Sequence, residues 1–282
     1  CIFVLLFHYT TQYAKIFNTT LTVSFLDFKY GGLGVDLFFI ISGFVIYLSI
    51  IKIKSPSDFL FKRFSRLYPT FWICVFLTFI IVNISNVKIY QRDFSELIVN
   101  LTMIPDVFGV KRIDGVYWSL LPELAFYLAM FFLLLIKKVK KIEIISFVWL
   151  FLILMNSLSD VMPIRVLLNL KFGYLFIMGM NFYKIKLRES NWIHHLLIWL
   201  SYGISFLVFE PSIKHLILLF FTLVFYLFAY DKLVWFTFKP LVKLGQISYA
   251  LYLIHQFVGY VIISRLIELG IHNSFLLLLI PA

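Results

Sequence analysis

Residues 31–47 read GGLGVDLFFIISGFVIY, an apolar run that opens with three glycines among its first four residues and carries one charged side chain, Asp36. Similar runs extend through all 282 residues, of which 62% are hydrophobic and 14% charged, and the mean hydropathy is +0.97. Soluble globular chains have roughly 45–50% apolar and about 25% charged residues, and a soluble domain cannot bury so much apolar surface. The composition therefore predicts an all-α integral membrane protein. It excludes disordered, collagen-like, coiled-coil and disulfide-stapled secreted chains.

A helix that crosses the hydrocarbon needs about 20 mostly apolar residues. Ten segments approach this pattern and predict a polytopic bundle of about ten helices in a single domain, residues 1–282: 1–17, 34–51, 70–87, 120–136, 142–157, 164–182, 193–210, 214–230, 245–264 and 273–282. The chain opens and closes within apolar runs and lacks a signal-peptide pattern. We therefore expect both terminal helices to be truncated and the chain to be a fragment.

The net charge of +11 is concentrated in short loops. Fifteen of the 25 lysines and arginines lie in the loops 52–69, 137–141, 183–192 and 231–244. Because these residues accumulate in cytoplasmic loops, the four loops are predicted to be cytoplasmic, and no nucleic-acid partner is expected. Cys1 and Cys74 lie in apolar runs without metal-ligand spacing, so no metal site is predicted.

Polar side chains inside a span are costly, so each needs a partner, a wet cavity or a function. His8 follows six apolar residues in the first span. It is either a hydrogen-bonded core histidine or a base, because imidazole accepts protons near neutral pH. Asp36 suits the positive end of a helix dipole. Ser42 and Gly43 are small residues that permit close helix packing or passage of a cofactor.

Two further segments place polar groups at the membrane edge. In FKRFSRLYPTFW, Arg63 and Arg66 share a helical face and are either topology anchors or a clamp for phosphate oxygens, and Pro69 is expected to end or kink the helix. In VYWSLLPELAFYL, Ser119 is a fair N-cap. Glu123 in the same segment either caps the helix or presents a carboxylate to a histidine or a substrate hydroxyl.

The segment GQISYALYLIHQFVGY at residues 245–260 places Ser248, Tyr252, His255 and Gln256 on one helical stripe. Hydrogen-bonding groups along one face of a membrane helix indicate a polar cavity or bonds between helices.

Together these segments resemble the membrane-bound acyltransferase 3 family, which O-acylates bacterial surface carbohydrates. The resemblance covers residues 8–255 and is carried in order by His8, GGLGVDLFFIISGF, KRFSRLYPTFW, WSLLPE followed by FYL, and ISYALYLIH. It implies a bundle of about ten helices in the bacterial inner membrane. This bundle takes an acyl group from cytoplasmic acyl-CoA and delivers it to a sugar on the far side of the membrane.

The resemblance also implies residue roles. His8 matches the family's essential first-span histidine, Arg63 and Arg66 its R-x-x-R pair, Glu123 the glutamate of W-S-L-x-x-E, and Tyr252 and His255 the late Y-L-x-H. The expected catalytic residues are His8, Glu123 and His255. The expected contacts of the donor, acetyl-CoA or another acyl-CoA, are Arg63, Arg66, Ser42 and Gly43. Those of the carbohydrate acceptor are Asp36, Trp118, Ser119, Tyr127 and Tyr252. An arginine-containing stretch that precedes the histidine in the family is absent, so we expect this fragment to lack part of the donor site.

An O-acyltransferase, with acetyl as the leading acyl group, is the first functional hypothesis, since the acceptor hydroxyl needs a base and the thioester carbonyl a charge stabiliser. No permanently bound cofactor is expected. A transporter or flippase is the alternative, with the same polar residues as a proton relay, although the internal repeats common in such folds are not evident. A scaffold role is the third possibility, and the His, Glu and Arg set argues against it.

Overall fold

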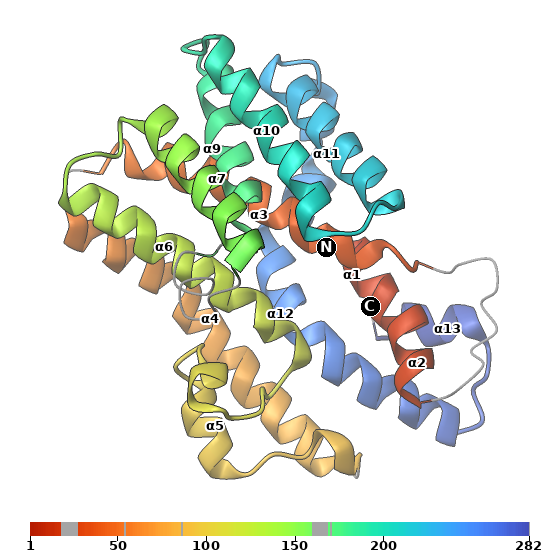
Figure 1. The fold of residues 1–282 in the computed structure, drawn as a ribbon. Helices are drawn as coiled ribbons and strands as arrows, with labels where there is room; N and C mark the ends of the chain where they lie inside the picture. Colours follow the sequence, from red (N-terminus) through yellow and green to blue (C-terminus); the bar gives the residue numbers. More distant parts are fainter. Residues whose placement is uncertain (18–27, 54, 86, 160–168, 170, 282) are drawn as a thin grey trace. The chain divides into compact units, whose positions relative to one another are not determined.

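A computed structural model describes residues 1–17, 28–53, 55–85, 87–159, 169 and 171–281. Over these residues the regular structure is helical and contains no strand (Figure 1), which confirms the all-α prediction. Within the same part of the chain, four helical segments are long and apolar enough to cross a membrane: Gly31–Ile50, Pro56–Ile84, Gly115–Leu135 and Lys239–Glu268.

The described α-helices are α1 (Ile2–Phe7), α2 (Tyr13–Phe17), α3 (Gly34–Ile50), α4 (Pro56–Ile84), α5 (Phe94–Asn100), α6 (Leu120–Leu135), α7 (Ile142–Ser159), α9 (Gly173–Lys186), α10 (Trp192–Val208), α11 (Ile213–Ala229), α12 (Lys239–Glu268) and α13 (Ser274–Leu279). A π-helical segment, η1 (His8–Gln12), joins α1 to α2, and a 3-10 segment, η5 (Gly115–Ser119), leads into α6. Helices occupy the predicted spans, although the start of span 164–182 lies outside the described residues. Among the described residues only four segments are long and apolar enough for a crossing, so the count of ten crossings stays a prediction.

Of the two expectations for Pro69, that the helix ends there or that it kinks there, the first is wrong. The helix that carries the arginine pair does not end at Pro69, because α4 continues through it to Ile84. Proline removes one backbone donor, and membrane helices tolerate this loss where neighbouring groups satisfy the freed carbonyl.

The chain forms two compact units. Unit 1 comprises Cys1–Gly34, Phe64–Leu121 and Lys239–Ala282, and unit 2 comprises Val35–Arg63 and Pro122–Phe238. Each is assembled from segments that are distant in sequence.

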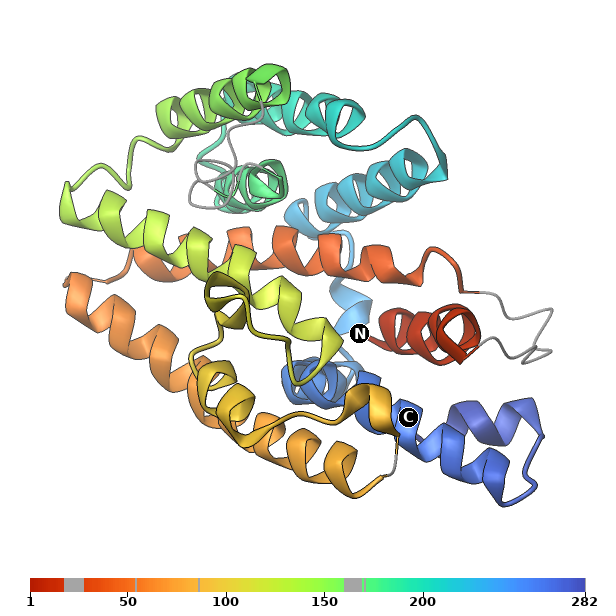
Figure 2. The same ribbon diagram turned by 60° about the horizontal axis from the view of Figure 1, so that its bottom comes forward.

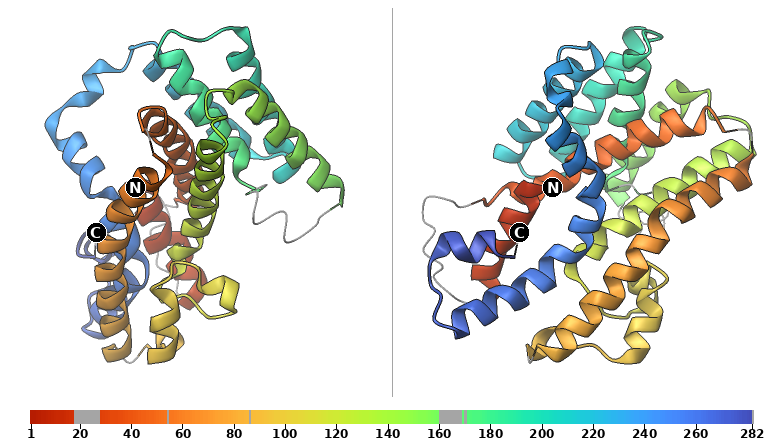
Figure 3. Two further views of the ribbon diagram at one scale, coloured as in Figure 1. Left: turned by 90° about the vertical axis from the view of Figure 1, so that its left-hand side faces the viewer. Right: turned by 180° about the vertical axis from the view of Figure 1, so that it is seen from behind.

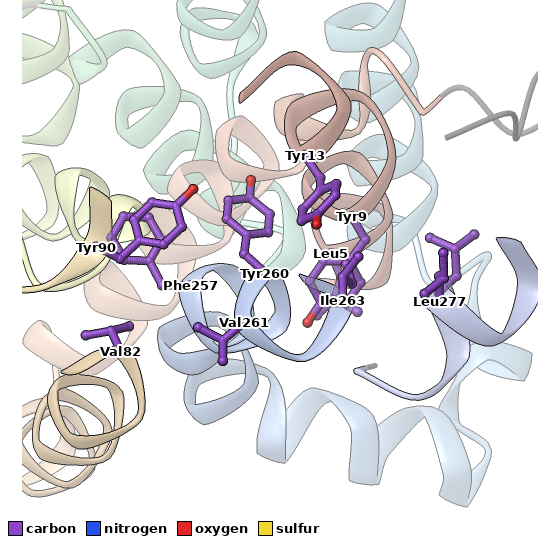
Figure 4. Packing of buried hydrophobic residues seen from close by; sticks show 11 residues of the cluster. Leu5, Tyr9, Tyr13, Val82, Tyr90, Phe257, Tyr260, Val261, Ile263 and Leu277 are labelled. Atoms are coloured by element: carbon purple, nitrogen blue, oxygen red, sulfur yellow. The ribbon is translucent and has the colours of Figure 1, made fainter. Parts of the chain in front are cut away.

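In unit 1, α12 is the central helix, and α1, η1, η5 and α13 pack against it (Figure 2). The contact with the first helix depends on Gly259, because a Cβ atom there would lie 2.2 Å from Cε1 of Tyr9. The Tyr9 hydroxyl donates to the His255 carbonyl oxygen at 2.9 Å. Tyr9 belongs to a buried aromatic cluster with Tyr13, Tyr90 and Tyr260 (Figure 4). The two ends of the chain thus share one core.

In unit 2, α7, α10 and α11 pack around α9 (Figure 3), most of whose residues are buried. Helix α3 crosses α9 at two glycines. A Cβ atom on Gly43 would lie 2.2 Å from the Phe176 carbonyl oxygen, and one on Gly179 would lie 2.0 Å from the Ile40 carbonyl oxygen. Two backbones can approach this closely only where side chains are absent.

Contacts in unit 2 also join loops that the sequence predicts to be cytoplasmic. Lys186 and Arg188, which end α9 and follow it, both bind Asp231 after α11. The hydrogen bond from Lys186 holds the pKa of Asp231 below its usual range. Tyr47, near the end of α3, donates to the Val139 carbonyl oxygen in the basic loop 137–141 at 3.4 Å. The loops after α9 and α11 therefore meet each other, and loop 137–141 packs against the end of α3.

Candidate active site

His8 lies where the first helix changes its hydrogen-bond pattern. The carbonyl of His8 accepts from the backbone N–H of Tyr13, five residues later, within the π-helical segment. Such segments are rare and occur frequently at functional sites, because the extra residue widens the turn. The His8 side chain is half-buried in unit 1.

The imidazole of His8 has two neighbours on α12. Its Nδ1 atom lies 3.2 Å from the hydroxyl oxygen of Tyr260. Its ring meets that of His255 edge-on, with centroids 5.0 Å apart. Both histidines are predicted catalytic residues, and the structure brings them together.

His255 is held in one tautomer by its own helix. Its Nδ1 atom lies 2.7 Å from the Tyr252 carbonyl oxygen. A carbonyl oxygen can only accept, so Nδ1 carries the proton and Nε2 of the neutral ring is bare. That Nε2 atom is buried and has no hydrogen-bond partner among the described residues. An unpaired acceptor beside a second imidazole is uncommon in a protein interior.

Asp114, which the sequence analysis did not select, connects η5 to α12. It is fully buried, and its two oxygens accept from the backbone N–H groups of Val116 at 3.1 Å and Phe257 at 2.9 Å. The second bond reaches α12 two residues after His255. Asp114 therefore positions the helix that carries the histidine.

The predicted acceptor contacts Ser119 and Tyr252 also meet in unit 1, with their hydroxyl oxygens 2.8 Å apart. The Tyr252 hydroxyl lies 3.2 Å from the Val116 carbonyl oxygen. Trp118 precedes Ser119 in η5 and is half-buried. Part of the predicted acceptor set thus borders the histidine pair.

Glu123 forms a second polar group, within unit 2. Its Oε1 atom accepts from the Ser42 hydroxyl at 3.1 Å and from the Tyr127 hydroxyl, in a short bond. Ser42 and Tyr127 were predicted to contact donor and acceptor respectively, and here both contact the carboxylate. Gly43 was expected to permit either close helix packing or passage of a cofactor, and its position at the crossing of α3 and α9 supports close packing.

The two arginines have different environments. Arg63 is 9% exposed, its Nη2 donates to the Ser49 hydroxyl at 3.0 Å, and its guanidinium lies over the Phe59 ring. Arg66 is exposed on the same helix. The two side chains therefore do not form one exposed clamp, because Arg63 is fixed by its own neighbours.

Asp36 is 8% exposed in the first turn of α3. The lysines that act on it electrostatically are Lys171 and Lys214, both in unit 2. In the described part of the chain, no three His, Cys, Asp or Glu side chains form a group that could hold a metal ion.

Comparison with known proteins identifies the family of this chain. The model of a family described as an acyltransferase domain matches residues 1–282. Nodulation protein 10 of Rhizobium leguminosarum bv. viciae is 28% identical over an alignment of 122 residues that covers 37% of this chain and 33% of that protein. The match thus spans about a third of the relative's length. No solved structure matches the chain significantly.

Proposed function

Because this chain belongs to the acyltransferase domain family, and is therefore a membrane acyltransferase, we propose that it O-acylates a carbohydrate. The donor is cytoplasmic acyl-CoA, with acetyl as the leading acyl group. The acceptor is a hydroxyl group of a cell-surface polysaccharide or its lipid-linked precursor, and the enzyme works in the bacterial inner membrane.

The observation that carries this proposal is the pair of imidazoles formed by His8 and His255. His8 takes the proton of the acceptor hydroxyl, and the oxygen attacks the thioester carbonyl carbon. As the new C–O bond forms, the C–S bond breaks, and His8 returns the proton to the departing CoA sulfur. The step needs a neutral imidazole at the start. It leaves all charges balanced at the end.

The two arginines have different roles, and only Arg66 binds the donor. Arg66 is exposed in the predicted cytoplasmic half of α4, and a guanidinium binds phosphate oxygens bidentately. Arg66 therefore meets the CoA phosphates directly. Arg63, which is held by Ser49, fixes the end of α3 against α4.

Inverted membrane vesicles from the source bacterium, with its own gene deleted and the full-length protein supplied, test this function. Radiolabelled acetyl-CoA is added, and label in lipid-linked and polymeric glycans is counted per unit of folded protein. We expect His8→Gln to lower incorporation at least about a hundredfold, because an amide cannot take up the proton. His272→Gln, which changes an exposed histidine, is the matched control.

Full incorporation by His8→Gln would remove His8 as the base. If a glycan precursor crossed the membrane without any acyl-CoA, the transporter alternative would replace the transferase.

A further inference from the structure

We propose that Tyr260 is a positioning residue that holds His8 in the tautomer required of a general base. This inference rests on the proposed function and deepens it. The Tyr260 hydroxyl oxygen lies 3.2 Å from Nδ1 of His8 and, one helical turn away, accepts from Nε2 of Gln256 at 3.4 Å. The phenol oxygen of Tyr260 therefore lies between the imidazole of His8 and the side-chain amide of Gln256.

The Tyr260 ring has little freedom to move. Its side chain is 0% exposed. Tyr13 packs edge-on against it at a centroid distance of 5.5 Å, and Tyr90 lies on another side at 6.0 Å. Figure 4 shows the three tyrosine rings in a row beside α12. Because neighbouring rings fix the phenol, its oxygen stays in place while His8 reacts.

The position of this oxygen decides which nitrogen of His8 reacts. Nδ1 faces Tyr260, so the nitrogen left for the acceptor hydroxyl is Nε2. A phenol hydroxyl can donate or accept, and Nε2 must be bare in the neutral ring to act as the base. We therefore assign the proton to Nδ1 and the accepting role to the phenol oxygen. When Nε2 takes up a proton, the bond from Nδ1 becomes charge-assisted and therefore stronger.

A phenol suits this position better than a carboxylate would. In a Ser–His–Asp triad an aspartate orients the imidazole and stabilises the imidazolium. An ionised carboxylate at membrane depth is costly, whereas a neutral phenol supplies an acceptor oxygen without a buried charge. Tyr260 thus performs the orienting part of the triad's chemistry.

The test compares two tyrosine-to-phenylalanine variants of the full-length protein in the same vesicles. Tyr260→Phe removes the oxygen that faces His8. Tyr90→Phe removes a buried hydroxyl from the same cluster, one that has no hydrogen-bond partner among the described residues. We expect Tyr260→Phe to lower kcat about ten- to a hundredfold, the worth of a hydrogen bond to a charged group. The KM for acetyl-CoA should stay unchanged, and Tyr90→Phe should turn over normally.

A second readout does not depend on substrate. Nitrogen-15 NMR of histidine-labelled protein in lipid gives the His8 signals by subtraction of the spectrum of His8→Gln. We expect a protonated Nδ1 and a bare Nε2 in the unmodified protein and in Tyr90→Phe, and loss of this fixed tautomer in Tyr260→Phe.

Equal turnover by the two phenylalanine variants, or a protonated Nε2 in the unmodified protein, would overturn the role of Tyr260. Different outcomes distinguish the role of Tyr260 from the role of His8. If His8→Gln is inactive and Tyr260→Phe turns over like Tyr90→Phe, only this inference falls. If His8→Gln is active, the proposed base falls, whatever the NMR spectrum of His8 shows.

Discussion

At the residue scale, the two arginines of α4 differ more than their spacing indicates. We expect Arg66→Lys to raise the KM for acetyl-CoA about tenfold, because a lysine keeps the charge but loses the bidentate fork, and to leave thermal stability unchanged. Arg63→Lys removes a buried bond to Ser49 and should lower the free energy of unfolding by about 1–3 kcal/mol. Donor titration and thermal unfolding in detergent measure the two effects. If Arg63→Lys and Arg66→Lys raised the KM equally and were equally stable, the two arginines would act together as one phosphate clamp.

The sequence reveals the histidines of the site but not their partners. His8 and His255 are conspicuous because titratable groups are rare in apolar runs. Tyr260 is one of 16 tyrosines. It continues the stripe of Ser248, Tyr252 and Gln256 by one turn, but a helical stripe does not identify a partner 252 positions earlier. Asp114 lies outside every predicted span, so the sequence gives no reason to expect a buried carboxylate there. The one sequence feature that indicates its role is its position directly before Gly115, where it caps the start of η5.

At the element scale, Gly43 tests whether small residues in α3 serve packing or passage of the donor. Gly43→Ala puts a Cβ atom 2.2 Å from the Phe176 carbonyl oxygen, and should lower the free energy of unfolding by about 1–3 kcal/mol. The KM for acetyl-CoA of the folded fraction should not change. Gly203→Ala is the control, since among the described residues no heavy atom beyond its chain neighbours and its own helical backbone lies within 4 Å of its Cβ position. It should stabilise α10 by up to about 1 kcal/mol. A raised KM in a stable Gly43→Ala protein would instead favour a donor passage.

Helices were predictable where apolar runs are long, and less so elsewhere. Hydropathy identifies the apolar part of α4 but not its start at Pro56, because the first turns carry the basic residues of a loop. Helix α5 has seven residues and no apolar run of membrane length. Its signal is the capping box of Asp93 and Glu96. The π-helical segment at His8 has no sequence signature, since it depends on how the first helix packs against α12.

At the scale of the whole molecule, contacts within each unit bring together chain segments that the prediction places on the same side of the membrane, and which side is cytoplasmic stays a prediction. In unit 1, Arg265 donates to the Ser85 carbonyl oxygen at 3.4 Å, so the end of predicted span 70–87 meets the segment that directly follows predicted span 245–264. In unit 2, His194 Nε2 lies 3.1 Å from Glu143 Oε1, beside the basic loops predicted to be cytoplasmic. Alternating loops can meet in this way only if the helices between them run in opposite directions.

Reporter fusions test this orientation directly. Fusions after Lys138 and after Lys186 should report the cytoplasm, because basic loops stay on that side, and fusions near Lys111 and Lys214 should report the outside. The contact between Lys186 and Asp231 adds a constraint that hydropathy does not supply. A fusion after Asp231 must agree with the one after Lys186, since an ion pair cannot form across a bilayer. If these two disagreed, the packing of α9 against α11 would be wrong; if Lys138 and Lys111 agreed, α6 would not cross the membrane.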